Sequence, residues 1–170
     1  MNIFLVLTIL STVVLFGFIA LSIDNFGILS SYSAYSTKWL EVFKKNSVWS
    51  YATMIAVLLI IPPLIEAGEG NYLQFLGFLS PVYLGIVALT PRWEFYKSEH
   101  IVHSLFAGLC AVSSILWAVL VTQTWGYIIL WTLTVLLIAL STRTLIKSIV
   151  FHLEIIAFAT IYTSLMATFI

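Results

Sequence analysis

Long apolar segments separated by short polar gaps dominate the pattern of this chain. Six segments reach or approach the run of about 20 apolar residues that an α-helix needs to cross a bilayer. They cover residues 3–22, 48–66, 72–90, 100–121, 125–141 and 148–169. The pattern predicts an all-α fold, a polytopic membrane bundle of six transmembrane helices in one integral membrane domain, residues 1–170. The fifth segment is the shortest, and the alternative is that it forms a single hydrophobic hairpin with the fourth.

The one long polar gap, residues 23–47, divides into two halves. In the second half Trp39, Leu40 and Phe43 recur at helical spacing against charged neighbours, which predicts a short interfacial helix over residues 37–45. In the first half, residues 30–36 place six hydroxyl side chains in seven positions. Serine favours non-helical backbone, so this half either folds back against the mouth of the bundle or stays a solvated loop.

Small residues within the segments indicate where helices touch. Gly77 and Gly85 on the third segment, and Ser104 and Gly108 on the fourth, would permit close approach of two backbones. Pro62-Pro63 is expected to bend or end the second segment.

Composition supports the membrane class, because 62% of residues are apolar and only 8% are charged. The formal net charge is zero, which argues against nucleic acid as a partner. Membrane lipids are the expected surroundings, with a homo-oligomer or a membrane protein partner as further possibilities.

The basic residues predict an orientation. All seven lie in the first, third and fifth gaps, and positively charged residues near helix ends are held on the cytoplasmic side. They are Lys38, Lys44, Lys45, Arg92, Lys97, Arg143 and Lys147. Both termini are therefore expected outside, in a multi-pass arrangement.

Three histidines lie near the predicted inner face. His100 and His103 share one side of a helix, and His152 lies about one turn inside the sixth segment. Three imidazoles at one depth are the ligand set of a catalytic zinc, which would activate a water molecule. Asp24 is the first choice for the acid in such a site, and Glu99 is the second. The alternative is that the histidines are hydrogen-bonded interfacial residues.

Glu154 is assigned a different role. It lies two residues from His152, about 200° around the helix, so the two side chains cannot face one compact site. We interpret Glu154 as a member of a structural ion pair with Lys147 or Arg143.

Short motifs carry a resemblance to known proteins. Residues 29–35, 74–79, 99–100 and 111–117 read LSSYSAY, QFLGFL, EH and AVSSILW. They resemble a group of small uncharacterised polytopic membrane proteins of gut bacteria and their phages. The resemblance implies a bacterial inner membrane and brings no known activity with it.

The histidine set, with an acid and serines, is also similar to the superfamily of alkaline ceramidases and adiponectin-type receptors. Those proteins are zinc-dependent amide hydrolases with seven helices, and their paired histidines lie on the last helix. The similarity implies that His100, His103 and His152 hold zinc. It further implies Asp24 as the base and Ser31 as an oxyanion donor.

Three hypotheses about function follow. The first is a metal-dependent intramembrane hydrolase of a lipid amide or ester at the cytoplasmic leaflet. The second is a non-enzymatic envelope accessory protein of a phage or bacterium that binds a partner protein or lipid. The third is a small transporter or channel, which would need more polar residues in the outer halves of the helices than this chain has.

Overall fold

The computed structural model describes residues 2–44, 47–144 and 147–170, and these residues form helices with no strand among them. The predicted all-α class is confirmed. In chain order the elements are α1 (Ile3–Phe26), α2 (Ala34–Phe43), α3 (Ser47–Ala67), α4 (Phe75–Ala88), α5 (Lys97–Leu116), the π-helical turn η1 (Trp117–Val121), α6 (Trp125–Ser141) and α7 (Ile149–Phe169).

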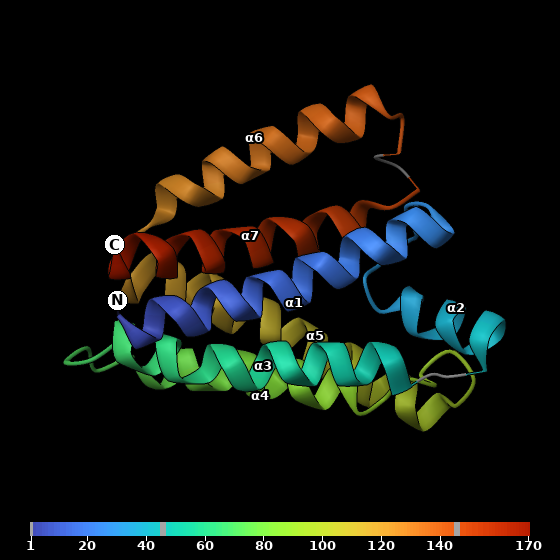
Figure 1. The fold of residues 1–170 in the computed structure, drawn as a ribbon, viewed down its shortest axis with the longest axis horizontal. Helices are drawn as coiled ribbons and strands as arrows, with labels where there is room; N and C mark the ends of the chain where they lie inside the picture. Colours follow the sequence, from blue (N-terminus) through green and yellow to red (C-terminus); the bar gives the residue numbers. More distant parts are fainter. Residues whose placement is uncertain (1, 45–46, 145–146) are drawn as a thin grey trace.

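The long helices run along one common axis, and α2 lies at the end opposite to both termini (Figure 1). Within the described ranges, four helices are long and apolar enough to cross a membrane: Ile3–Phe26, Val48–Ala67, Lys97–Val121 and Ile149–Phe169. The helices Phe75–Ala88 and Trp125–Ser141 are apolar but shorter. The membrane class is thus supported, with four spans by length and composition.

Helix boundaries depart from the predicted segments where a local signal extends or shortens the helix. α1 continues past residue 22 to Phe26 and ends at Gly27, whose φ of 72° suits glycine and whose N–H donates to the Ile23 carbonyl at 2.7 Å. α3 runs through Pro62-Pro63 to Ala67, so the expectation that the prolines end this helix was wrong. Neighbouring helices in a bundle support a helix across such positions.

A short helix forms where the interfacial helix was predicted, but its position and burial differ. α2 begins at Ala34 rather than residue 37, and Lys45 lies outside the described residues. Tyr35 and Trp39 are buried. Trp39 donates from Nε1 to Ser22 Oγ at 3.0 Å, and its ring stacks on Phe18 at 5.6 Å. One face of α2 is therefore part of the core.

A close helix contact involves Gly77 on α4. A Cβ atom there would lie 2.8 Å from the Leu64 carbonyl oxygen and 2.8 Å from Trp117 Nε1, so this position requires glycine. Gly108 does not lie in such a seam, because a Cβ there meets nothing within 4 Å, and Ser104 is exposed. The prediction that these two α5 residues mark a helix contact was wrong.

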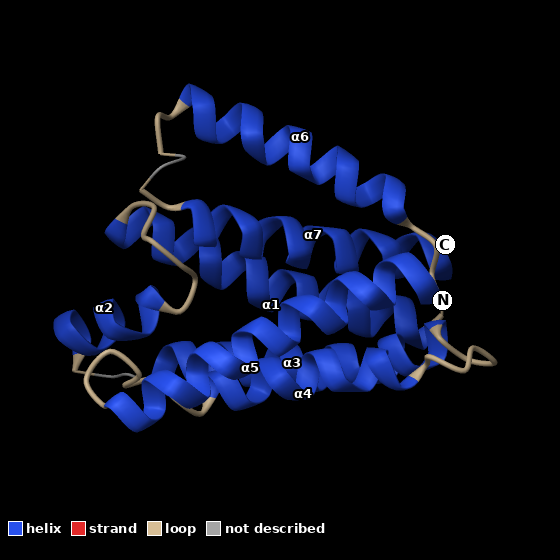
Figure 2. Cartoon of the chain, turned by 180° about the vertical axis from the view of Figure 1, so that it is seen from behind, coloured by secondary structure: helices blue, strands red, loops and turns tan. Residues whose placement is uncertain are grey.

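α6 stands apart from the other helices (Figures 1 and 2). In the part of the chain that the structure describes, α7 is the one helix that packs closely along it. Val135 and Ala139 are the buried residues of α6. The bundle therefore has a compact side and a loosely attached helix.

Candidate functional site

The histidines of α5 lie against Trp93. The ring of His103 stacks on Trp93 with centroids 4.8 Å apart, and the exposed ring of His100 stacks on it at 5.5 Å. His103 is buried, and its Nδ1 lies 2.9 Å from Thr90 Oγ1. The Thr90 hydroxyl already donates to the Val87 carbonyl, so we assign the Nδ1 proton as donor to Thr90. His103 Nε2 is buried without a hydrogen-bond partner among the described residues.

His152 belongs to a different environment. Its Nδ1 lies 2.6 Å from the Ser148 carbonyl oxygen, and its Nε2 lies 3.4 Å from Thr144 Oγ1 in the connection between α6 and α7. Both partners of His152 thus lie in the connection that precedes α7, whereas the partner of His103, Thr90, lies just after α4.

The predicted zinc site gains no support from this arrangement. Over residues 2–44, 47–144 and 147–170, no group of three or more His, Cys, Asp and Glu side chains is arranged to hold a metal ion. Asp24 is exposed near the end of α1. Ser31 accepts the Ala34 N–H, in the first turn of α2, at both its Oγ and its carbonyl oxygen, each at 3.2 Å. The zinc-dependent hydrolase remains a prediction from sequence.

The hydroxyl-rich loop, residues 27–33, folds back against the mouth of the bundle, as one of the two interpretations predicted. The Ser30 carbonyl accepts from the Phe151 N–H of α7 at 3.0 Å. Tyr32 is buried, and its hydroxyl lies 2.7 Å from Thr53 Oγ1. Because Thr53 donates to the Trp49 carbonyl, Tyr32 is the donor in this pair. Burial raises the pKa of Tyr32 well above its usual value, so the phenol keeps its proton.

Glu154 holds this loop to α7. Its Oε2 accepts a hydrogen bond from the Tyr32 backbone N–H at 2.6 Å. The predicted ion pair with Lys147 or Arg143 was wrong, since both basic side chains are exposed and Lys38–Glu41 is the salt bridge found among the described residues. The predicted divergence of Glu154 and His152 is confirmed, because they line different cavities.

The cavity at Glu154, which we call the loop cavity, measures about 80 Å³. It lies between the hydroxyl-rich loop, α4, α5 and α7. Its polar lining comes from Tyr32, Ser33, Cys110, Ser114 and Glu154. It is a small chamber with one carboxyl group.

Larger apolar cavities flank α6. Two of them, of about 280 and 360 Å³, lie between α1, α6 and α7 and share Phe16 and Ile155 in their linings, and we call them together the α1–α6 groove. A third, of about 200 Å³, lies on the opposite side, between α5, α6 and α7. The sequence does not indicate these three cavities, because α6 is apolar on every side and its pattern does not show which side lacks a neighbour.

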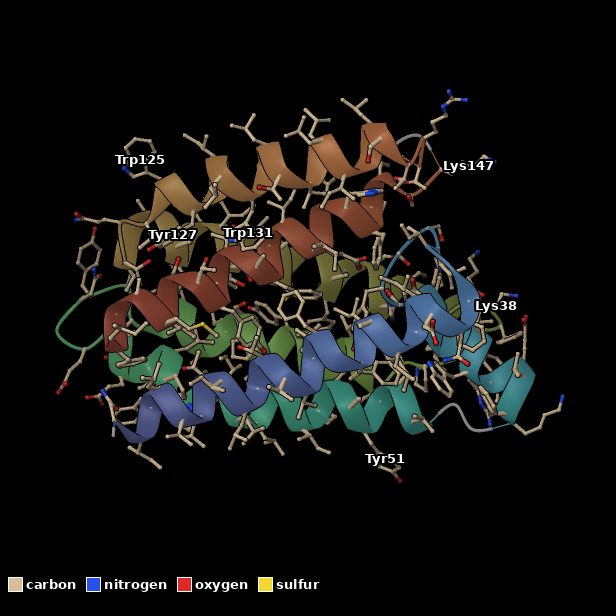
Figure 3. The ribbon with its side chains drawn as sticks, turned by 45° about the horizontal axis from the view of Figure 1, so that its top comes forward. Lys38, Tyr51, Trp125, Tyr127, Trp131 and Lys147 are labelled. Carbon is tan, nitrogen blue, oxygen red and sulfur yellow. The ribbon has the colours of Figure 1, made fainter. Side chains whose placement is uncertain are left out.

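Polar groups lie mainly at the ends of this region. Within the groove, Trp131 of α6 donates from Nε1 to Thr163 Oγ1 of α7 at 3.2 Å. Lys147 and Lys38 lie at one end of the molecule, whereas Trp125 and Tyr127 lie at the other (Figure 3). The groove is therefore an apolar channel along α7 with a basic residue near one end.

Comparison with protein-family models, with curated proteins and with solved structures finds no match for this chain. Function has to be inferred from the geometry described above.

Proposed function

We propose that this chain is a non-enzymatic, six-span protein of a bacterial inner membrane that binds an anionic phospholipid beside α6. An acyl chain would occupy the α1–α6 groove, and the phosphate would lie near Arg143 and Lys147. In this proposal all the lysines and arginines face the cytoplasm and both termini lie outside, as the charge pattern predicts.

The observation that carries the proposal is the shape and lining of the α1–α6 groove. Its lining is almost wholly apolar, from residues such as Phe16, Ile19 and Ile155. Along α7 the lining runs from His152 to Met166, which spans about 21 Å at the helical rise. One leaflet of the hydrocarbon core is about 15 Å deep, so the groove is long enough for an acyl chain.

Charge supports an anionic headgroup. Arg143 follows α6 and Lys147 precedes α7, so both belong to the connection at the inner end of the groove, and both are exposed. A basic residue near a membrane surface contributes about 1 kcal/mol of attraction to anionic lipid. The two residues together favour phosphatidylglycerol over a zwitterionic lipid.

Filling the groove tests acyl-chain binding. Ala20 lines the groove and is exposed, so Ala20→Trp places a large ring in the groove rather than in the core. Val13→Trp is the control, because Val13 is 64% exposed on the same helix and is not part of the groove lining. Native mass spectrometry of detergent-purified protein with added phosphatidylglycerol should show binding about tenfold weaker in Ala20→Trp alone, a loss of about 1.4 kcal/mol.

Equal lipid retention in both variants would overturn the proposal. So would a loss of dimer mass in Ala20→Trp with unchanged lipid content, because the groove would then seat a second copy of the chain.

Removing the basic pair tests the headgroup. In Arg143→Gln/Lys147→Gln the preference for phosphatidylglycerol over phosphatidylcholine should fall about tenfold, and Arg92→Gln, an exposed cation between α4 and α5, should retain it. A wild-type protein without that preference, or an equal loss in Arg92→Gln, contradicts the anionic headgroup.

A further inference from the structure

Glu154 is a carboxyl group at bilayer depth that the proposed lipid site does not use. It lies on α7 five residues after Ile149, about 7.5 Å along the helix from its first residue. An ionisable side chain inside a membrane span is costly, and such residues usually serve a function. The loop cavity gives this carboxyl a defined environment.

No basic side chain neutralises Glu154 in the described part of the chain. None of its described lysines, arginines or histidines lies within 4.0 Å of the carboxylate, whose hydrogen bond is to the Tyr32 N–H. The titratable groups that face the cavity with it are Tyr32 from the loop and Cys110 from α5, and both are neutral when protonated. α4 contributes the apolar Leu84 and Val87. A carboxylate there would have no compensating positive charge.

The loop cavity has room for a few water molecules but few oxygen ligands. Its volume of about 80 Å³ corresponds to two or three waters at about 30 Å³ each. The Tyr32 hydroxyl is bonded to Thr53, and Ser114 Oγ pairs with Ser80 Oγ at 2.5 Å, so Ser33 and Glu154 remain. Hard metal ions take about six oxygen ligands, whereas a proton needs one carboxylate oxygen.

We infer that Glu154 is a proton-binding site. The proton comes from the aqueous phase, is relayed by water in the loop cavity and binds Oε1, while Oε2 keeps the Tyr32 N–H. In the unprotonated state that hydrogen bond has a charged acceptor and is stronger. Loss of the proton therefore strengthens the hydrogen bond that joins the hydroxyl-rich loop to α7.

Labelling with dicyclohexylcarbodiimide tests the site directly. This apolar reagent reacts with protonated carboxyl groups, and peptide mass analysis of the full chain in lipid nanodiscs locates the product. At pH 7 Glu154 should be modified at least about tenfold more than the exposed Glu69, because a carboxyl group without a compensating positive charge holds its proton. Modification of Glu154 should fall as pH rises and should be equal in sodium chloride and choline chloride.

Infrared titration of variants provides the second measurement. Glu154→Gln keeps an acceptor for the Tyr32 N–H but should lose the absorption band of a protonated carboxyl group, whereas Glu69→Gln should keep it. Labelling of Glu154 no greater than that of Glu69, protection by sodium, or a band that persists in Glu154→Gln would each overturn the inference. If Glu154→Gln does not fold, labelling of the wild-type chain decides.

Discussion

The compact side of the bundle and the helix α6 are held in place by different means. α3 packs against α1 and α4, α4 packs against α5, and at Gly77 the α4 backbone lies directly against the Leu64 carbonyl of α3. α6 packs along α7, with cavities of about 200 to 360 Å³ on its two sides. Two polar contacts join it to α7: Trp131 Nε1 donates to Thr163 Oγ1, and the Thr124 and Ser164 hydroxyl oxygens lie 2.6 Å apart.

This difference shows how a membrane protein can keep space for a ligand. Lipid tails are as apolar as leucine, so helices associate only where their surfaces fit closely or share hydrogen bonds. The single glycine of α6, Gly126, meets nothing within 4 Å, and large exposed residues such as Leu133 and Leu137 cover the helix. A helix of this composition leaves seams on both sides that lipid can occupy.

The largest effect is expected at the tightest contact of the compact side. Gly77→Ala forces a methyl group to within 2.8 Å of the Leu64 carbonyl oxygen, so the two helices must separate. We expect a loss of about 1–3 kcal/mol in the free energy of unfolding in detergent, because overpacked positions cost that much. Gly108→Ala on α5 is the control and should be neutral or stabilising, since a Cβ there has open space. Similar losses of unfolding free energy in both variants would contradict a close helix contact at Gly77.

An intermediate effect is expected in the polar centre of the compact side. Ser11 Oγ donates to the Ala56 carbonyl at 2.7 Å, so the Tyr162 hydroxyl, 2.6 Å from Ser11 Oγ, is the donor between them. Tyr162→Phe should lower the free energy of unfolding by about 1 kcal/mol, as interhelical hydrogen bonds in membranes contribute. Tyr51→Phe should change nothing measurable, since Tyr51 is 67% exposed and points away from the bundle (Figure 3). A chemical unfolding series in detergent measures both.

The smallest effect is expected at α6. Trp131→Phe removes the bond to Thr163 and should cost about 0.5 kcal/mol. The distribution of distances between spin labels on α6 and α7 should broaden in this variant, because few other polar contacts hold α6. Trp125→Phe, at a 62% exposed ring, should leave the distance distribution unchanged. If both distributions match the wild type, the bond to Thr163 does not fix the position of α6.

The sequence predicted those features that follow from periodicity along one helix. The segment at residues 125–141 coincides with α6, and the angle between His152 and Glu154 placed them correctly on different sides of α7. Serine-rich composition predicted non-helical backbone up to residue 36, which is confirmed for residues 27–33 but wrong for residues 34–36, where α2 begins.

Features that depend on which element packs against a given face of a helix could not be predicted from the sequence. The helical period gives relative angles but no absolute direction, so Glu154 was assigned to exposed cations rather than to the Tyr32 N–H. Gly77 and Gly108 are both glycines in apolar segments, and the packing of Leu64 and Trp117 against Gly77 distinguishes them. The histidine set depended on an assumed convergence of two helices, for which the described residues give no metal-holding group.

The two ends of the chain meet at one end of the bundle, where Phe4 of α1 stacks on Phe169 of α7 at 5.6 Å (Figure 1). Halves of a split fluorescent reporter fused to these ends would therefore reassemble within a single molecule. A signal from such fusions would not demonstrate self-association. Reporter halves carried on separate copies, each at the same end, are the appropriate design for measuring dimers.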